Sequence, residues 1–189
     1  MTRGVSRRDL FTFWRKPPAV DPPAAPAPAA PPRPSALLRP PGALPEALFL
    51  GTCTRSGHCA LACPRQAIFL LDPSFGRAAG TPMIRARAAP CVVCEGLECT
   101  RACPSGALAR IGVAELRMGT AAVDAAGCVT WRGQSCRACV DACPIPGAIA
   151  LHDGAHPVVD AARCTGCGVC EHVCPTEQAS IAVTPARSL

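Results

Sequence analysis

The sequence predicts an α+β fold in which short strands and helical turns alternate around cysteine-rich loops. Fifteen of the 189 residues are cysteine, and they fall into four groups that each end in Cys-Pro. A short apolar run follows every group. Such self-similarity indicates a repeated structural unit, here strand, cysteine loop, helical turn and strand. The apolar runs predicted to form strands are 67–70, 106–108, 148–151, 157–159 and 180–183.

The chain divides into three regions by composition. Residues 1–16 form a basic arm with a twin-arginine pair, and residues 17–45 hold 12 of the 22 prolines, mixed with alanine. Proline fixes φ and removes a backbone donor, so the second region is predicted to be a disordered, extended tether. Residues 46–189 hold every cysteine and form the predicted folded domain.

The fourth cysteine group has the most specific spacing. It reads Cys164-x2-Cys167-x2-Cys170-x3-Cys174-Pro175, which is the run by which bacterial ferredoxins hold [4Fe–4S] clusters. Three cysteines ligate one cluster and the last ligates its neighbour. Gly166 and Gly168 let the loop turn sharply and bring backbone N–H groups close to sulfur. Pro175 is expected to begin a helical turn, where its missing N–H costs nothing.

The second and third groups keep the trailing x3-Cys-Pro and lengthen the loop before it. Their predicted cluster ligands are Cys91, Cys94, Cys99 and Cys103 in the second group and Cys128, Cys136, Cys139 and Cys143 in the third. Loop insertions are thermodynamically cheap, so both groups are predicted to bind clusters. The domain is therefore predicted to be a polyferredoxin of two bacterial-ferredoxin-like units, each holding two [4Fe–4S] clusters.

The first group departs from this pattern because Ser56 stands where a second cysteine is expected. Its cysteines are Cys53, Cys59 and Cys63. The site could hold a [3Fe–4S] centre, use the Ser56 oxygen as a replacement ligand, or hold no cluster; His58 is a further substitute ligand to consider. We favour an altered cluster, because Cys63 still serves the neighbouring one. The chain is thus predicted to carry three or four clusters.

Disulfides and zinc are the alternative explanations of the cysteines. Fifteen is an odd number, and cysteines this closely spaced pair poorly with one another. Structural zinc sites usually show two separated pairs rather than a Cys-x2-Cys-x2-Cys run. A purely structural metal-binding module stays open as an alternative function.

The rest of the sequence argues for an electron carrier, or an electron-transfer subunit, rather than an enzyme. The net charge of +6 comes mostly from arginine, which we interpret as a scattered basic surface. No aromatic residues interleave with these arginines, so a nucleic-acid partner is not expected. No run of about 20 apolar residues exists, which excludes a transmembrane helix. No nucleophile–base pair or glycine-rich phosphate loop is recognisable, so no catalytic residue is predicted.

The sequence from Leu38 to Pro185 resembles the ferredoxin-type, four-cluster proteins of periplasmic nitrate reductase and methylamine-utilisation systems. The resemblance rests on Arg39-Pro40-Pro41-Gly42-Ala43, Gly80-Thr81-Pro82, Met118-Gly119, the Cys128-x7-Cys136 spacing and residues 164–171. Family members usually carry cysteine where this chain has Ser56. The resemblance implies electron relay from a quinol-oxidising membrane partner to a terminal reductase or molybdoenzyme, with membrane association only through that partner. A cytoplasmic factor that matures a molybdenum oxidoreductase is the alternative.

Related four-cluster subunits also imply which groups share clusters, namely the first with the fourth and the second with the third. The implied ligand sets are Cys53, Cys59 and Cys174; Cys164, Cys167, Cys170 and Cys63; Cys91, Cys94, Cys99 and Cys143; and Cys128, Cys136, Cys139 and Cys103. Pairing the first group with the second and the third with the fourth is the alternative.

The arginine pair Arg7-Arg8 looks like a twin-arginine export signal. A signal peptide also needs an apolar segment of about 7–15 residues. Here Trp14-Arg15-Lys16-Pro17-Pro18 follows instead. We therefore expect a cytoplasmic protein, with periplasmic export by the twin-arginine route as the alternative.

Overall fold

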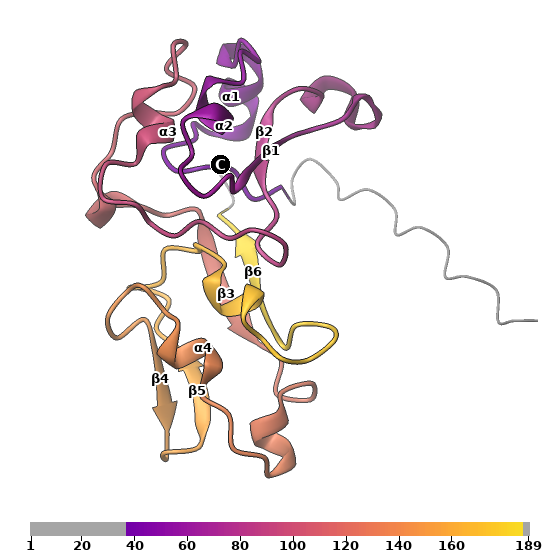
Figure 1. Cartoon of the computed structure of the whole chain (residues 1–189), viewed down its shortest axis with the longest axis vertical. Coiled ribbons are helices and arrows are strands. Elements are labelled where there is room, and N and C mark those ends of the chain that lie inside the picture. Colours follow the sequence, from indigo (N-terminus) through magenta and orange to yellow (C-terminus); the bar gives the residue numbers. More distant parts are fainter. Residues whose placement is uncertain (1–36, 187–189) are drawn as a thin grey trace, which may run out of the picture. The chain divides into compact units, whose positions relative to one another are not determined.

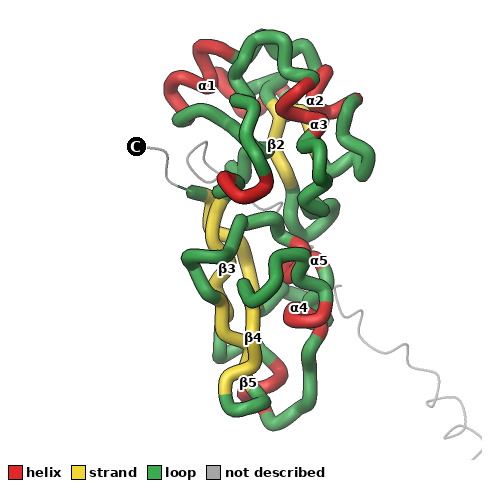
Figure 2. Tube along the Cα trace, turned by 90° about the vertical axis from the view of Figure 1, so that its left-hand side faces the viewer, coloured by secondary structure: helices red, strands yellow, loops and turns green. Residues whose placement is uncertain are grey.

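The computed structural model describes residues 37–186, which include every cysteine. The twin-arginine arm and residues 17–36 of the predicted tether lie outside the described residues. Figures 1 and 2 show short helices and short strands joined by long loops. This mixed content confirms the α+β prediction. The elements are α1 Glu46–Thr52, α2 His58–Leu61, β1 Ile68–Leu70, η3 Pro73–Ala78, β2 Pro82–Ile84, α3 Glu98–Arg101, η4 Val113–Glu115, β3 Gly119–Val123, η5 Val129–Arg132, α4 Ala138–Asp141, β4 Ile149–His152, β5 His156–Val159, α5 Val169–His172 and β6 Ile181–Pro185.

The strands form three antiparallel pairs whose order repeats along the chain. In residues 119–186, called the second half below, the inner strands β4 and β5 form a hairpin and the outer strands β3 and β6 pair with each other. In residues 37–118, the first half, β1 and β2 form the inner pair. The outer pair is reduced there to a single bridge between Ala43 and Leu108. Four of the five predicted strand runs are therefore strands, and the run 106–108 contributes only this bridge.

Four short helices each carry the cysteine at the third ligand position of a group. Cys59, Cys99, Cys139 and Cys170 lie in α2, α3, α4 and α5. The prediction that proline after the last cysteine begins a helical turn is wrong, because the helix precedes that cysteine and the residues after Cys-Pro form turns. The helix must come first because it closes the ligand loop and delivers the last cysteine beyond its own C-terminus.

The predicted tether ends earlier than residue 45. Leu37, Leu38 and Arg39 are buried, and Pro40 and Pro41 are among the most completely buried residues of the described chain. The Ile84 N–H donates a hydrogen bond to the Leu38 carbonyl, at 2.8 Å, which ties this segment to β2. Prolines there serve as packing surface, which composition alone does not distinguish from a tether.

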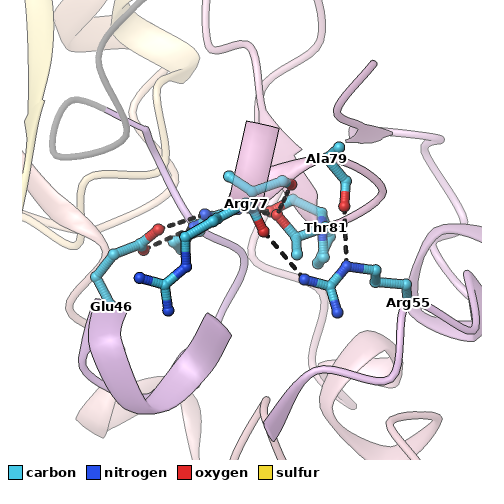
Figure 3. A network of polar contacts seen from close by, with 8 residues as sticks. Glu46, Arg55, Arg77, Ala79 and Thr81 are labelled. Carbon is cyan, nitrogen blue, oxygen red and sulfur yellow. Dashed lines mark hydrogen bonds and ion pairs between the residues drawn. The ribbon is translucent and has the colours of Figure 1, made fainter. Parts of the chain in front are cut away.

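Arg39 forms the most connected buried polar group of the first half. Its guanidinium lies 2.5 Å from the Glu46 carboxylate and donates to the Thr81 hydroxyl at 2.9 Å and to the Pro82 carbonyl at 2.7 Å. It also lies over the Phe49 ring, 4.7 Å from the ring centroid. This group holds the segment before α1 against β2, and Figure 3 labels two of its members, Glu46 and Thr81.

We expect Arg39→Met to lower the free energy of unfolding by about 3 kcal/mol, the low end for a buried ion pair, because Arg39 is buried but its partner Glu46 is 25% exposed. The measurement is denaturant unfolding of anaerobic protein. The control is Arg85→Met, which removes an exposed arginine whose guanidinium lies 5.3 Å from the Phe69 ring. Equal losses in the two variants would mean that Arg39 has no special structural role.

The apolar cores are small and include cysteines. Phe49, Ile84 and Leu116 centre one cluster of buried residues in the first half, and Ala121, Ile149 and Ile181 centre another in the second half. Small domains with thin cores commonly depend on metal or covalent links. None of the helices in residues 37–186 has the length and apolar character needed to cross a bilayer.

Candidate metal centres

Four cavities in the structure are each walled by cysteines. The linings include Cys53, Ser56, Cys59 and Cys103 at site 1; Cys63, Cys91, Cys94 and Cys99 at site 2; Cys128, Cys136, Cys139 and Cys174 at site 3; and Cys143, Cys164, Cys167 and Cys170 at site 4. Each site therefore takes one loop of three positions from one cysteine group and the last cysteine of another. All fifteen cysteines are free thiols, and all are used.

The pairing implied by related four-cluster subunits is wrong for this structure. The first group shares its cavities with the second, and the third shares its cavities with the fourth. The cause is helix packing, because α2 lies against α3 and α4 lies against α5. Figure 2 shows α2 beside α3, and α4 beside α5. Each helix ends next to the ligand loop of its partner and so presents its last cysteine there.

The chemistry and size of the cavities fit iron–sulfur clusters. Thiolates are soft ligands that suit such clusters and zinc. The space not filled by protein atoms is about 280–360 Å³ at each cavity, and part of it is solvent at the open mouth. Within residues 37–186, no three His, Cys, Asp or Glu side chains converge as they would around a single ion. The cysteines instead surround a space suited to a group of several atoms.

Backbone N–H groups point at the sulfur atoms of the trailing cysteines. Ala67 donates to Cys63 Sγ at 3.3 Å, and Leu108 donates to Cys103 Sγ at 3.4 Å. Ser180 N–H lies 3.3 Å from Cys174 Sγ. The apolar runs after the first, second and fourth Cys-Pro thus each supply a backbone donor to the preceding cysteine. Hydrogen bonds to ligand sulfur tune the reduction potentials of iron–sulfur sites.

Burial and hydrogen bonding divide the thiols into two kinds. Burial raises the pKa of Cys99 and Cys170 to about 12, and of Cys91 and Cys139 to about 11. Burial opposes ionisation of Cys174 too, but the Thr176 hydroxyl and neighbouring N–H groups outweigh it and lower the pKa. At neutral pH the buried thiols of the metal-free chain carry their protons, so cluster binding must release them.

Two glycines of the fourth group sit where no side chain fits. Gly166 and Gly168 have φ of 71° and 86°. A Cβ on Gly166 would lie 2.6 Å from Gly119 backbone atoms, and one on Gly168 would overlap Ala86. The predicted sharp turn is therefore confirmed, and close approach of other segments adds a second requirement for glycine.

Site 1 keeps Ser56 in the position of the missing cysteine. Ser56 and His58 are both exposed, but only Ser56 is part of the cavity lining. Arg55 holds the loop: it donates to the carbonyls of Ala79 at 2.9 Å, Arg77 at 3.0 Å and Cys53 at 3.2 Å. Figure 3 shows Arg55 reaching the Ala79 and Arg77 carbonyls. A loop held in this way keeps its geometry without the fourth thiolate.

Sites 2 and 4 lie next to each other where the two halves meet. The Cys91 N–H donates to the Cys167 carbonyl at 3.0 Å, so a ligand loop of the first half touches a ligand loop of the second. Site 1 adjoins site 2 through α2 and α3, and site 3 adjoins site 4 through α4 and α5. The cavities therefore follow the order 1, 2, 4, 3, which differs from their order along the chain.

Arg87 links the first half to the loop that carries Cys174. Its guanidinium donates to the carbonyls of Glu171 and Cys174 at 2.8 Å and of Thr176 at 2.9 Å, with a longer bond to His172. The Arg87 carbonyl in turn lies 2.9 Å from His172 Nδ1. One exposed side chain thus fixes the segment between α5 and β6 that completes site 3.

We expect Arg87→Gln to make site 3 lose iron to a chelator about 10–100 times faster, the usual effect of removing an outer-shell partner. The faster release should involve about a quarter of the iron, because site 3 is one of four sites. Arg87→Lys should fail to restore the wild-type rate, because one compact ammonium cannot reproduce the two separate guanidinium nitrogens that reach the Cys174 and Thr176 carbonyls. Arg85→Gln is the control, and an equal effect there would contradict a specific role for Arg87.

Sequence reasoning missed the structural arginines. Arg39, Arg55 and Arg87 were assigned to a scattered basic surface, yet each binds backbone or side-chain oxygens around a cysteine loop or its support. Arg39 lies within a motif shared with relatives, which is the one signal that could have marked it. Arg55 and Arg87 carry no such signal, because their carbonyl partners come from distant segments.

Comparison with known proteins agrees with the chemistry of these sites. Residues 132–178 match the 4Fe-4S dicluster domain family. The chain is 43% identical over 162 residues to the "Ferredoxin-type protein NapG" of Escherichia coli K12, which covers 78% of this chain and 70% of the relative. It is 43% identical over 159 residues to the "Methylamine utilization ferredoxin-type protein MauM" of Paracoccus denitrificans, covering 78% and 71%. The MauM protein of Methylophilus methylotrophus is 40% identical over 164 residues, covering 81% and 73%. No solved structure matches the chain.

Proposed function

Because this chain belongs to the family of the NapG and MauM ferredoxin-type proteins, we propose that it is an electron carrier in which four cysteine-walled sites form one relay. That it is an iron–sulfur electron-transfer protein rather than an enzyme follows from the family and from the dicluster domain. The relay itself rests on one observation, the contact between the Cys91 and Cys167 loops. This contact brings the two halves together at ligand loops rather than at their outer surfaces.

The four sites fall into two bacterial-ferredoxin-like units, with sites 1 and 2 in the first half and sites 3 and 4 in the second. Sites 2, 3 and 4 each offer four thiolates for a [4Fe–4S] cluster, and such clusters exchange single electrons when bound. The chain's own residues hold the cluster through cysteine, screen it with the small apolar cores, and aim N–H groups at ligand sulfur. Potentials of the four sites should differ, because the number of N–H and hydroxyl donors to sulfur differs from site to site.

Site 1 is proposed to hold a cluster with three cysteine ligands. The cavity of about 310 Å³ is of the same size as the fully cysteine-lined ones, and the Arg55 contacts keep its loop in place. The alternative of an empty site has less support, because Cys103 Sγ still accepts the Leu108 N–H, as Cys63 and Cys174 accept theirs, and lies 3.6 Å from the Ser105 hydroxyl.

The partners are proposed from the family. We propose that electrons enter from a membrane protein that oxidises quinol and leave to a terminal oxidoreductase, and that contact with the membrane runs through that partner. We also propose that the protein works in the cytoplasm, since Trp14-Arg15-Lys16 and prolines follow the arginine pair. Fractionation of cells that express the tagged full chain tests the location, and recovery in the periplasm would contradict it.

Potentiometric titration monitored by EPR tests the function. Anaerobically purified protein should be brown and should take up several electrons reversibly, one per cluster. A colourless protein that contains zinc in place of iron would overturn the proposal and favour a structural metal-binding module.

Ser56→Cys should convert site 1 into an ordinary four-thiolate site. In the wild-type protein, about a quarter of the iron should go to a chelator in a fast phase, because site 1 lacks one soft ligand. In Ser56→Cys the fast phase should disappear, because site 1 should then release its iron as slowly as the other three sites. Ser56→Ala is the matched control and should keep the fast phase. A wild-type protein without a fast phase would contradict the three-cysteine site.

A further inference from the structure

An exposed tryptophan stands at the site 3 end of the structure. Trp131 belongs to η5, in the eight-residue step from Cys128 to Cys136, and 42% of its surface is exposed. Its indole stacks on the His156 ring, with centroids 4.4 Å apart and planes inclined by 27°. Val158, which lies two residues further along β5 and so on the same face of the strand, is 50% exposed. We call Trp131, His156 and Val158 the Trp131 face.

The Trp131 face is the outer side of site 3. Val129 and Thr130, which directly precede Trp131, and Pro157, which lies between His156 and Val158, line the site 3 cavity. The Thr130 hydroxyl lies 3.3 Å from Cys128 Sγ and 3.5 Å from His156 Nδ1. A single side chain, that of Thr130, therefore separates a predicted ligand sulfur from His156, on which the exposed Trp131 stacks. Electron exchange between proteins weakens steeply with distance, so a docking face must lie this close to a redox site.

Charge indicates what kind of surface would fit the Trp131 face. Residues 119–186 contain three arginines against six acidic residues. Two of those arginines, Arg137 and Arg163, already pair with Asp141 and Asp160. No described arginine forms an ion pair with the remaining carboxylates, which are Asp124, Asp153, Glu171 and Glu177. Thiolates that bind clusters add further negative charge.

The first half has the opposite balance, with nine arginines against five acidic residues in 37–118. The two ends of the row of sites are thus charged differently. Asp153, whose side chain is 80% exposed, lies in the turn between β4 and β5 beside His156. Partners that carry opposite charges are steered to different ends.

We propose that the Trp131 face is the docking surface for a redox protein whose own docking face is cationic. Aromatic side chains such as tryptophan are the usual anchors of protein interfaces, and charge complementarity around them selects the partner. The inference rests on the proposed electron-transfer function, but its test measures binding alone.

The experiment measures the affinity of the holoprotein for a basic mitochondrial-type cytochrome c, used as a cationic one-electron probe, by calorimetry at low and moderate salt. An acidic cytochrome b5 is the anionic counterpart. The variants are Trp131→Ala and Val158→Lys. Leu70→Lys is the matched control, since Leu70 is an apolar residue at the end of strand β1 in the first half and is 45% exposed. Iron content of each variant is measured beside the affinity.

The proposal expects cytochrome c to bind more tightly than cytochrome b5 and to lose affinity as salt rises. Trp131→Ala should weaken binding about 30-fold, the effect of a hot-spot residue, and Val158→Lys should weaken it while leaving the iron content unchanged. Leu70→Lys should bind as the wild type does. Unchanged affinity in Val158→Lys, an equal loss in Leu70→Lys, or preference for cytochrome b5 would overturn the proposal. So would a dimer of the protein itself that Trp131→Ala disrupts. A protein without iron would instead count against the proposed function.

Discussion

Replacing Cys63 and Cys91 together by alanine should remove about four iron atoms and four sulfides per chain, because both cysteines belong to site 2 and only two ligands would remain there. Replacing Cys63 and Cys164 should instead remove about two iron atoms and little sulfide. Each of sites 2 and 4 would then keep three cysteines, as site 1 does by nature. Iron and sulfide analysis of anaerobically purified variants measures the difference.

The same pair of variants decides how the cysteine groups share clusters. If the first group shared its clusters with the fourth, Cys63 and Cys164 would serve one cluster. The Cys63/Cys164 variant would then lose about four iron atoms, and the Cys63/Cys91 variant about two. EPR of the oxidised proteins provides an independent readout, because three-cysteine sites should yield [3Fe–4S] signals in the Cys63→Ala/Cys164→Ala variant. Circular dichroism of both variants controls for loss of the fold.

Gly166→Ala should destabilise the protein by about 3 kcal/mol and release iron from site 4. Part of this arises from φ of 71°, which an alanine adopts at a cost of about 1–2 kcal/mol. The rest arises from the new Cβ, which would lie 2.6 Å from Gly119 backbone atoms and would push β3 away from the ligand loop. Denaturant unfolding and chelator-accessible iron measure the two effects.

Gly154→Ala is the matched control for this substitution. Gly154 has almost the same φ, 70°, and no atom lies within 4 Å of the position its Cβ would take. The free energy of unfolding of Gly154→Ala should therefore fall only by the part due to backbone strain, and this variant should keep all its iron. Equal destabilisation of the two variants would contradict the account of how the site 4 loop packs on Gly119.

Local spacing predicted each loop of ligands but not the way loops combine. Three cysteines a few residues apart must face one cavity, so the spacing determines them without tertiary information. The last cysteine of a group goes wherever its helix docks, and no spacing in the sequence marks that α2 docks on α3. Resemblance to other four-cluster subunits filled this gap with the wrong pairing.

The motifs shared with relatives turn out to be packing residues as well as markers of a family. Arg39 binds Thr81 and Pro82, so two motifs far apart in sequence meet in one buried group. Gly119 of another motif lies against Gly166 in the fourth cysteine loop. Sequence alone showed that these positions matter to the resemblance, but their physical reason requires the contacts. The same holds for Pro40 and Pro41, which composition assigned to a tether and burial assigns to the core.

Iron and acid-labile sulfide per chain, together with EPR of the oxidised and reduced protein, test most directly that all four cavities hold clusters. We expect about 15 iron atoms with an oxidised [3Fe–4S] signal, or about 16 without it if Ser56 completes site 1. About 12 iron atoms would contradict a cluster at site 1, and a protein with negligible iron would contradict the account as a whole.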